Sequence, residues 1–123
     1  MAKKILIVED NEKNRVLVRD ILSFHGYSVL EAADGTEGLE MAVEHKPDLI
    51  LMDIQMPLMD GLTAIKALRG ISETRETKVI ALTSFAMKGD KEKIMGAGFD
   101  GYITKQINTR QLPEKLKGPW GKA

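Results

Sequence analysis

The sequence predicts an α/β fold, a doubly wound parallel sheet of five strands with helices on both faces. Three short runs, residues 5–8, 49–52 and 79–82, are continuously apolar, as in strands buried on both faces of a parallel sheet. Apolar residues between these runs recur at helical spacing. Strand and helix alternate five times along the chain, a pattern that specifies right-handed crossovers in a single sheet.

The five strands differ in polarity. The runs at 5–8, 49–52 and 79–82 contain no polar residue, so we expect them to be the central strands. Two weaker runs at 27–30 and 99–103 carry polar residues. These two are expected nearer the edges of the sheet.

The first helix follows the first strand. Leu17, Ile21 and Phe24 recur at helical spacing and indicate its apolar face. Asn11 is a suitable N-cap, and Gly26 is well placed to end the helix.

Four more helices are predicted from the same signals. The second carries Leu39, Ala42 and Val43 and ends before Pro47, and the third carries Leu62, Ile65 and Leu68 between residues 60–61 and Gly70. The fourth is shorter and more polar and runs from about Lys88 to Ala97, with Gly96 and Gly98 near its end. The last begins near Leu112–Pro113, must stop by Gly118–Pro119, and is unusually short.

Composition narrows the class of protein. The 123 residues fit one domain, and Lys+Arg equals Asp+Glu at 18 each, which disfavours nucleic-acid binding by net charge. The chain has no cysteine, so thiolate metal sites and disulfides are excluded. The apolar runs are too short for a membrane span or a signal peptide. We expect a soluble, cytoplasmic protein without a membrane partner.

Chemically active residue types follow the predicted strands. Glu9 and Asp10 follow the first strand, Asp53 closes the third, Thr83 follows the fourth, and Lys105 comes shortly after the fifth. Functional crevices of such sheets lie outside the carboxyl ends of the strands. If the first and third strands are neighbours, their ends lie about 5 Å apart, so Asp10 and Asp53 can share one ion. Hard oxygen ligands favour Mg²⁺, and the lysine adds charge suited to phosphoryl transfer.

These segments resemble the motifs of response regulator receiver domains. The matching stretches are VEDN at 8–11, LMDIQMPLMDG at 51–61, ALTS at 81–84 and YITK at 102–105. The resemblance covers residues 3 to 117, and residues 83–90 are particularly similar to single-domain regulators of cell division and polarity. It implies the flavodoxin-like strand order 2-1-3-4-5. We therefore expect a receiver domain at 1–117 and a tail at 118–123.

The resemblance also implies roles for individual residues. Asp53 accepts a phosphoryl group from the phosphohistidine of a histidine kinase or histidine phosphotransfer protein. Mg²⁺ is held by Glu9, Asp10, Asp53 and the backbone carbonyl of Gln55. Lys105 pairs with the phosphoryl oxygens.

A second group of residues is implied in the response to phosphorylation. Thr83 moves to bond the phosphoryl group, and Tyr102 rotates inward, which re-forms the surface of the fourth helix, fifth strand and fifth helix for a downstream protein target. Gln55 and Phe85 modulate water access and hence phosphoryl lifetime. Such a domain assists its own phosphorylation and dephosphorylation but is not a turnover enzyme.

Two features depart from the family pattern. Gln106 stands where receivers usually have a proline that follows the lysine through a cis bond. A cis bond before a non-proline residue costs about 2.5–4 kcal/mol, so we predict a trans bond and a displaced loop. The tail is the second departure, since receivers usually end in a longer helix; Trp120 packs back, docks a partner, or marks a truncation.

The sequence disfavours two other functions and leaves a third open. A flavin or nucleotide site needs a Gly- or Ser/Thr-rich phosphate loop after the first strand, where this chain is acidic. An aspartyl phosphatase takes its nucleophile from the first strand rather than the third. The stronger alternative is a degenerate receiver that binds partners without phosphorylation, motivated by Gln106 and opposed by the retention of Glu9, Asp10, Asp53, Thr83 and Lys105.

Overall fold

A computed structural model describes residues 3–54, 61–83 and 88–104 of the chain. Five parallel strands form one sheet in the order β2-β1-β3-β4-β5. They are β1 (Lys4–Val8), β2 (Ser28–Ala32), β3 (Leu49–Asp53), β4 (Lys78–Thr83) and β5 (Gly101–Thr104). The order confirms the prediction, and the three wholly apolar runs are the central strands.

Some strand boundaries differ from the predicted ones. β4 includes Thr83, which pairs with Thr104 of β5, so this threonine ends the strand rather than following it. β5 starts at Gly101 instead of residue 99. The reason lies in Asp100, whose carboxylate, instead of a backbone carbonyl, accepts the N–H of Val79 at 2.8 Å.

Helix α1 (Glu12–Phe24) begins and ends where its sequence predicts. The Asn11 side chain accepts a hydrogen bond from the Asn14 N–H at 3.0 Å, and Gly26 follows the helix with φ +90°, a conformation that favours glycine.

The predicted apolar face of α1 is wrong in part. Phe24 is 88% exposed and Leu17 is 43% exposed, whereas Val18, Ile21 and Leu22 are buried. The helix carries several overlapping apolar stripes, and the one centred on Val18 and Leu22 packs on the sheet. Spacing alone does not select among such stripes.

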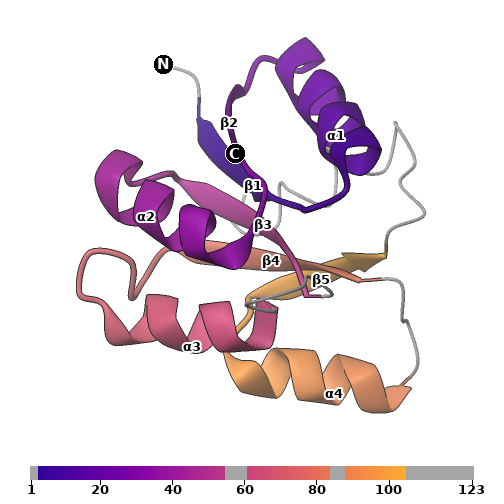
Figure 1. The fold of residues 1–123 in the computed structure, drawn as a ribbon. Helices are drawn as coiled ribbons and strands as arrows, with labels where there is room; N and C mark the ends of the chain where they lie inside the picture. Colours follow the sequence, from indigo (N-terminus) through magenta and orange to yellow (C-terminus); the bar gives the residue numbers. More distant parts are fainter. Residues whose placement is uncertain (1–2, 55–60, 84–87, 105–123) are drawn as a thin grey trace.

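Helices α2 (Gly35–His45), α3 (Gly61–Gly70) and α4 (Lys88–Ala97) cover the other face of the sheet, opposite α1 (Figure 1). The Asp34 side chain caps α2 by accepting from the Glu37 N–H at 2.8 Å. Left-handed Lys46 (φ 48°) ends α2 just before Pro47. α4 has ten residues, the same number as α3, so it is polar but not shorter than α3.

The sheet separates two apolar layers. Among the residues that the structure describes, ten buried ones form the layer toward α1: Ile5, Ile7, Val18, Ile21, Leu22, Leu49, Leu51, Ile80, Leu82 and Ile103. The layer toward α2, α3 and α4 includes Val8, Ala42, Met52, Ile65 and Ile94. Burial of apolar surface contributes roughly 25 cal/mol per Å², so this two-sided burial is the largest favourable contribution to folding.

Gly38 lets α2 approach the end of β1 closely. A Cβ at this position would lie 2.8 Å from Val8 Cγ2. Glycine is therefore required if Val8 keeps its position. The contact is next to Glu9, so the packing of α2 also fixes the chain where it leaves the sheet.

Across residues 3–54, 61–83 and 88–104, no helix combines the length and the apolar character needed to span a membrane.

Candidate metal site at the carboxyl edge of the sheet

Three carboxylates meet where β1 and β3 end. Glu9 and Asp53 are buried, at 1% and 0% exposure, while Asp10 is exposed. One oxygen of each carboxylate lies within 4.8 Å of the corresponding oxygens of the other two. The predicted proximity of Asp10 and Asp53 is therefore confirmed.

Strand register places these side chains together. Val8 of β1 is paired with Met52 of β3, so Glu9 and Asp53 are the next residues along neighbouring strands. Asp53 is paired in turn with Leu82 of β4, and the Ile54 N–H donates to the Leu82 carbonyl at 3.1 Å. Asp53 is therefore fixed in β3, between β1 and β4. The apolar runs that precede Glu9 and Asp53 determine the register of β1 and β3.

The arrangement favours a cation. Two unit charges 4.8 Å apart repel by roughly 3 kcal/mol at an effective dielectric constant of 20. Three carboxylates in a partly buried cluster are stabilised when a cation shares them. Their oxygens are hard ligands, and two or three carboxylates with an open side fit Mg²⁺ better than a softer metal.

Glu9 is held at both its side chain and its backbone. Asn14 Nδ2 donates to Glu9 Oε1 at 3.2 Å, and Arg15 Nη1 donates to the Glu9 carbonyl at 3.0 Å. The Glu9 N–H donates to the Ala32 carbonyl at 3.1 Å. Although Glu9 lies beyond β1, its position is fixed from α1 and from β2.

Thr83 and Tyr102 lie on β4 and β5, the two strands that follow β3 in the sheet. Thr83 is fully buried at the end of β4, one residue beyond the partner of Asp53. Tyr102 pairs with Ala81, which is two residues before Thr83 and therefore on the same face. Tyr102 is half-buried and packs against the core under α4. The two predicted switch residues thus lie on the same face of two adjacent strands.

Several predicted residues lie outside the described part of the chain. They are Gln55, Phe85, Lys105, Gln106 and the tail at 118–123. The trans bond expected between Lys105 and Gln106 stays a prediction. Conversely, sequence reasoning missed Asn14 and Arg15, whose only signal is that they occupy the first turn of the helix after Asp10.

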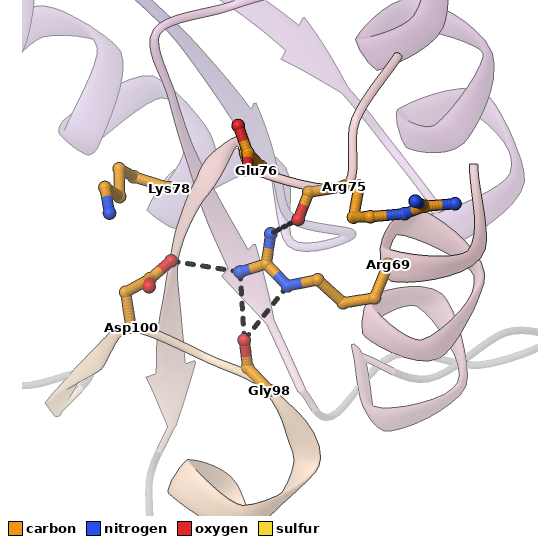
Figure 2. A pocket seen from close by; sticks show the side chains of 6 residues that line it. All are labelled: Arg69, Arg75, Glu76, Lys78, Gly98 and Asp100. Carbon is orange, nitrogen blue, oxygen red and sulfur yellow. Dashed lines mark hydrogen bonds and ion pairs between the residues drawn. The ribbon is translucent and has the colours of Figure 1, made fainter. Parts of the chain in front are cut away.

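A pocket around Arg69 lies near the end of the strands opposite to the carboxylate cluster (Figure 2). Its volume is about 630 Å³. The Arg69 guanidinium donates to the carbonyls of Gly98, Arg75 and Thr77 and to the Asp100 carboxylate, at 2.6–3.2 Å. These bonds use all five N–H donors of the side chain. Arg69 therefore links α3 to the loop before β4 and to the loop before β5. We call this set of hydrogen bonds the Arg69 clasp.

Comparison with known proteins identifies relatives over the whole chain. The family model described as the response regulator receiver domain matches residues 5–117. Polar-differentiation response regulators DivK of Brucella anthropi and Brucella ovis are each 46% identical over 123 residues, which is all of this chain and all of theirs.

Solved structures agree with these relatives. The chemotaxis response regulator CheY4 of Vibrio cholerae has a TM-score of 0.92 at 32% identity, over 97% of this chain and 99% of that one. The receiver domain of a sensor histidine kinase from Pseudomonas aeruginosa has a TM-score of 0.87 at 34% identity, over 95% of this chain and 96% of that one. The latter structure holds a magnesium ion coordinated in its active-site cleft.

Proposed function

Because the chain belongs to the response regulator receiver domain family, we propose that it is a phosphorylation-dependent signalling switch with Asp53 as the phosphoacceptor. The observation that carries this proposal is the convergence of Glu9, Asp10 and Asp53, with oxygens within 4.8 Å of one another, at the carboxyl edge of the sheet. Thr83 ends the adjacent strand. Burial of a charged carboxylate such as that of Asp53 costs free energy unless hydrogen bonds or a bound ion offset this cost.

In the proposed reaction, a carboxylate oxygen of Asp53 attacks the phosphorus of a phosphohistidine on a partner protein. The new bond is P–O, and the bond that breaks is P–N, whose electron pair stays on the imidazole nitrogen. The product is an acyl phosphate on Asp53 and an unmodified histidine on the partner. Catalysis of such a transfer depends mainly on positioning and on neutralising charge.

Glu9, Asp10 and Asp53 would hold the Mg²⁺ ion, joined by the backbone carbonyl of Gln55. When bound, the ion neutralises charge on the carboxylates and on the transferred phosphoryl oxygens. Lys105 is proposed to pair with the same oxygens. The magnesium ion in the Pseudomonas aeruginosa receiver domain supports this assignment.

The proposed response uses Thr83 and Tyr102. A phosphoryl group on Asp53 offers new acceptors to the Thr83 hydroxyl, and movement of this residue leaves space that Tyr102 fills from the next strand. Because Tyr102 packs against the core under α4, its rotation would change the surface of α4 and β5. Gln55 and Phe85 are proposed to set the lifetime of the phosphoryl group.

The partners follow from the family. We propose a histidine kinase or histidine phosphotransfer protein as the donor and a separate protein as the downstream target, all in the cytoplasm. The 46% identity to polar-differentiation regulators over the full chain supports a role in cell polarity or division. Receiver domains assist their own phosphoryl chemistry, and we propose no turnover reaction for this one.

The test is the intact mass of the protein after incubation with Mg²⁺ and acetyl phosphate, with Asp53→Asn as the control. We expect one added phosphoryl group on the wild type, none on the variant, and none on the wild type when a chelator replaces Mg²⁺. If neither acetyl phosphate nor a partner kinase yields an adduct while Mg²⁺ still binds, the degenerate, phosphorylation-independent receiver becomes the better description. Gln106, in place of the usual proline, is the observation that favours this alternative.

A further inference from the structure

Asn14 and Arg15, in the first turn of α1, both hold the metal-site residue Glu9. We propose that these two side chains are positioning residues that set the affinity of the site for Mg²⁺ and its preference for Mg²⁺ over Ca²⁺. This inference rests on the proposed metal function of Glu9, Asp10 and Asp53.

Asn14 determines the orientation of the Glu9 carboxylate. Its amide donates to Oε1 at 3.2 Å, which restricts rotation of a side chain that is otherwise packed in the protein at 1% exposure. Asn14 is itself fixed, because its N–H donates to the N-cap oxygen of Asn11 at 3.0 Å. The carboxylate is therefore oriented by a rigid helix end before any ion arrives.

Arg15 determines the position of the Glu9 backbone. Its Nη1 donates to the Glu9 carbonyl at 3.0 Å, while its Nε donates to Glu31 Oε1 on β2 at 3.2 Å. Arg19 donates to the other oxygen of Glu31 at 3.4 Å. The side chain of Arg15 is only 18% exposed, so this chain of contacts is partly shielded from water.

Glu31 links Arg15 to Arg19 through two ion pairs. The hydrogen bond from Arg19 to Asp20, and then its contact with Glu31, raise the pKa of the Arg19 guanidinium above its usual value. The Glu31 carboxylate contacts Arg15 with one oxygen and Arg19 with the other, and these two contacts fix its orientation.

The consequence differs for two similar ions. Mg²⁺ requires nearly octahedral oxygen geometry at short distances, whereas Ca²⁺ accepts variable geometry and more ligands. A ligand held in advance therefore favours Mg²⁺, and a loosened ligand costs Mg²⁺ affinity more than Ca²⁺ affinity. A general folding defect would weaken binding of both ions alike.

The experiment compares Mg²⁺ and Ca²⁺ dissociation constants of the wild type and Asn14→Ala by NMR titration of backbone amides near the site. Loss of a residue that orients a metal ligand typically weakens metal binding by at least about tenfold, and we expect that loss for Mg²⁺ with a clearly smaller one for Ca²⁺. Asn11→Ala removes the cap that fixes the Asn14 backbone but leaves the direct contact to Glu9, so its loss of Mg²⁺ affinity should be smaller than that of Asn14→Ala. An equal loss for both ions, or an equal effect of Asn11→Ala, would overturn the proposal.

A second variant tests the Arg15 branch without touching the first turn of α1. Glu31→Gln removes the negative charge that pairs with Arg15 and so weakens this contact, and Glu44→Gln removes the same charge from an exposed position on α2. We expect Glu31→Gln to weaken Mg²⁺ binding more than Glu44→Gln does. Equal effects would show that charge alone is responsible and would overturn this branch. A wild type that binds no Mg²⁺ would instead refute the proposed metal function itself.

Discussion

The carboxylates of Glu9 and Asp53 lie within 4.8 Å of each other at the ends of two neighbouring strands, and both residues are buried. In the absence of a cation their negative charges repel each other, and this repulsion opposes folding. The same repulsion favours binding of a cation.

Asp53→Asn is therefore expected to stabilise the metal-free protein while it removes the phosphoacceptor. Removal of one charge from the cluster should raise the free energy of unfolding by about 1–3 kcal/mol. Urea denaturation in a chelator measures this effect, with Asp48→Asn, outside the cluster, as a control. A destabilised Asp53→Asn variant would mean that Asp53 makes favourable contacts that outweigh the repulsion.

Mg²⁺ is expected to stabilise the wild type more than it stabilises the Asp53→Asn variant. An ion that binds only the folded state, at roughly 100 times its dissociation constant, adds about 2.7 kcal/mol to the free energy of unfolding. The measurement is the urea midpoint at increasing Mg²⁺ concentration, reversed by chelator. Equal stabilisation of both proteins would place the bound ion elsewhere.

Much of the fold could be predicted because the central strands are wholly apolar. Runs such as 5–8 and 49–52 are typical of a strand covered on both faces, and the residues that follow such strands lie at one edge of the sheet. Glu9, Asp10, Asp53 and Thr83 could be placed near one another for this reason. The strand order came from the family resemblance, since periodicity does not specify which strands are neighbours.

Other features depend on contacts that a linear pattern does not contain. The start of β5 is set by the Asp100 side chain, which takes the place of a backbone acceptor. The support of Glu9 by Asn14 and Arg15 needs the exact direction of the first turn of α1. The wrong assignment of Phe24 has a similar cause, because several apolar stripes on α1 compete and only tertiary packing selects one.

The exposed position of Phe24 leads to a direct test. Phe24→Ala should change the free energy of unfolding by less than about 0.5 kcal/mol, since the side chain is 88% exposed. Ile21→Ala, on the buried stripe, should cost about 2–4 kcal/mol. Chemical denaturation of both variants gives the comparison. A large loss for Phe24→Ala would indicate that this ring packs against the rest of the chain in solution.

The clasp made by Arg69 predicts a strong dependence on the guanidinium group. Arg69→Met keeps much of the stem but removes the guanidinium donor from the carbonyls of Gly98 and Thr77. The Asp100 carboxylate loses one of its two donors and keeps the Val79 N–H, so we expect a loss of about 2–4 kcal/mol. Arg69→Lys should recover only part of this loss, because an ammonium has three donors and no planar fork.

Arg75→Met is the matched control for the clasp. Only the backbone carbonyl of Arg75 bonds to Arg69, and its exposed side chain points away from that guanidinium (Figure 2). Thermal unfolding should therefore change little in this variant. Equal losses for Arg69→Met and Arg75→Met would argue for a general effect of positive charge in this region.

The contact between Gly38 and Val8 predicts a coupled pair of substitutions. Gly38→Ala places a methyl group 2.8 Å from Val8 Cγ2, and the displacement of α2 or β1 should cost about 1–3 kcal/mol, reduced by the better helix propensity of alanine. Val8→Ala alone leaves a cavity beneath α2 and is also destabilising.

In the double variant the new methyl group occupies part of that cavity, so the combined loss should be smaller than the sum of the single losses by about 1 kcal/mol. Urea denaturation of the four proteins in this cycle measures the coupling, and strictly additive losses would mean that α2 moves away from β1 without strain. Because Val8 directly precedes Glu9, the Gly38→Ala variant should also bind Mg²⁺ more weakly than the double variant does.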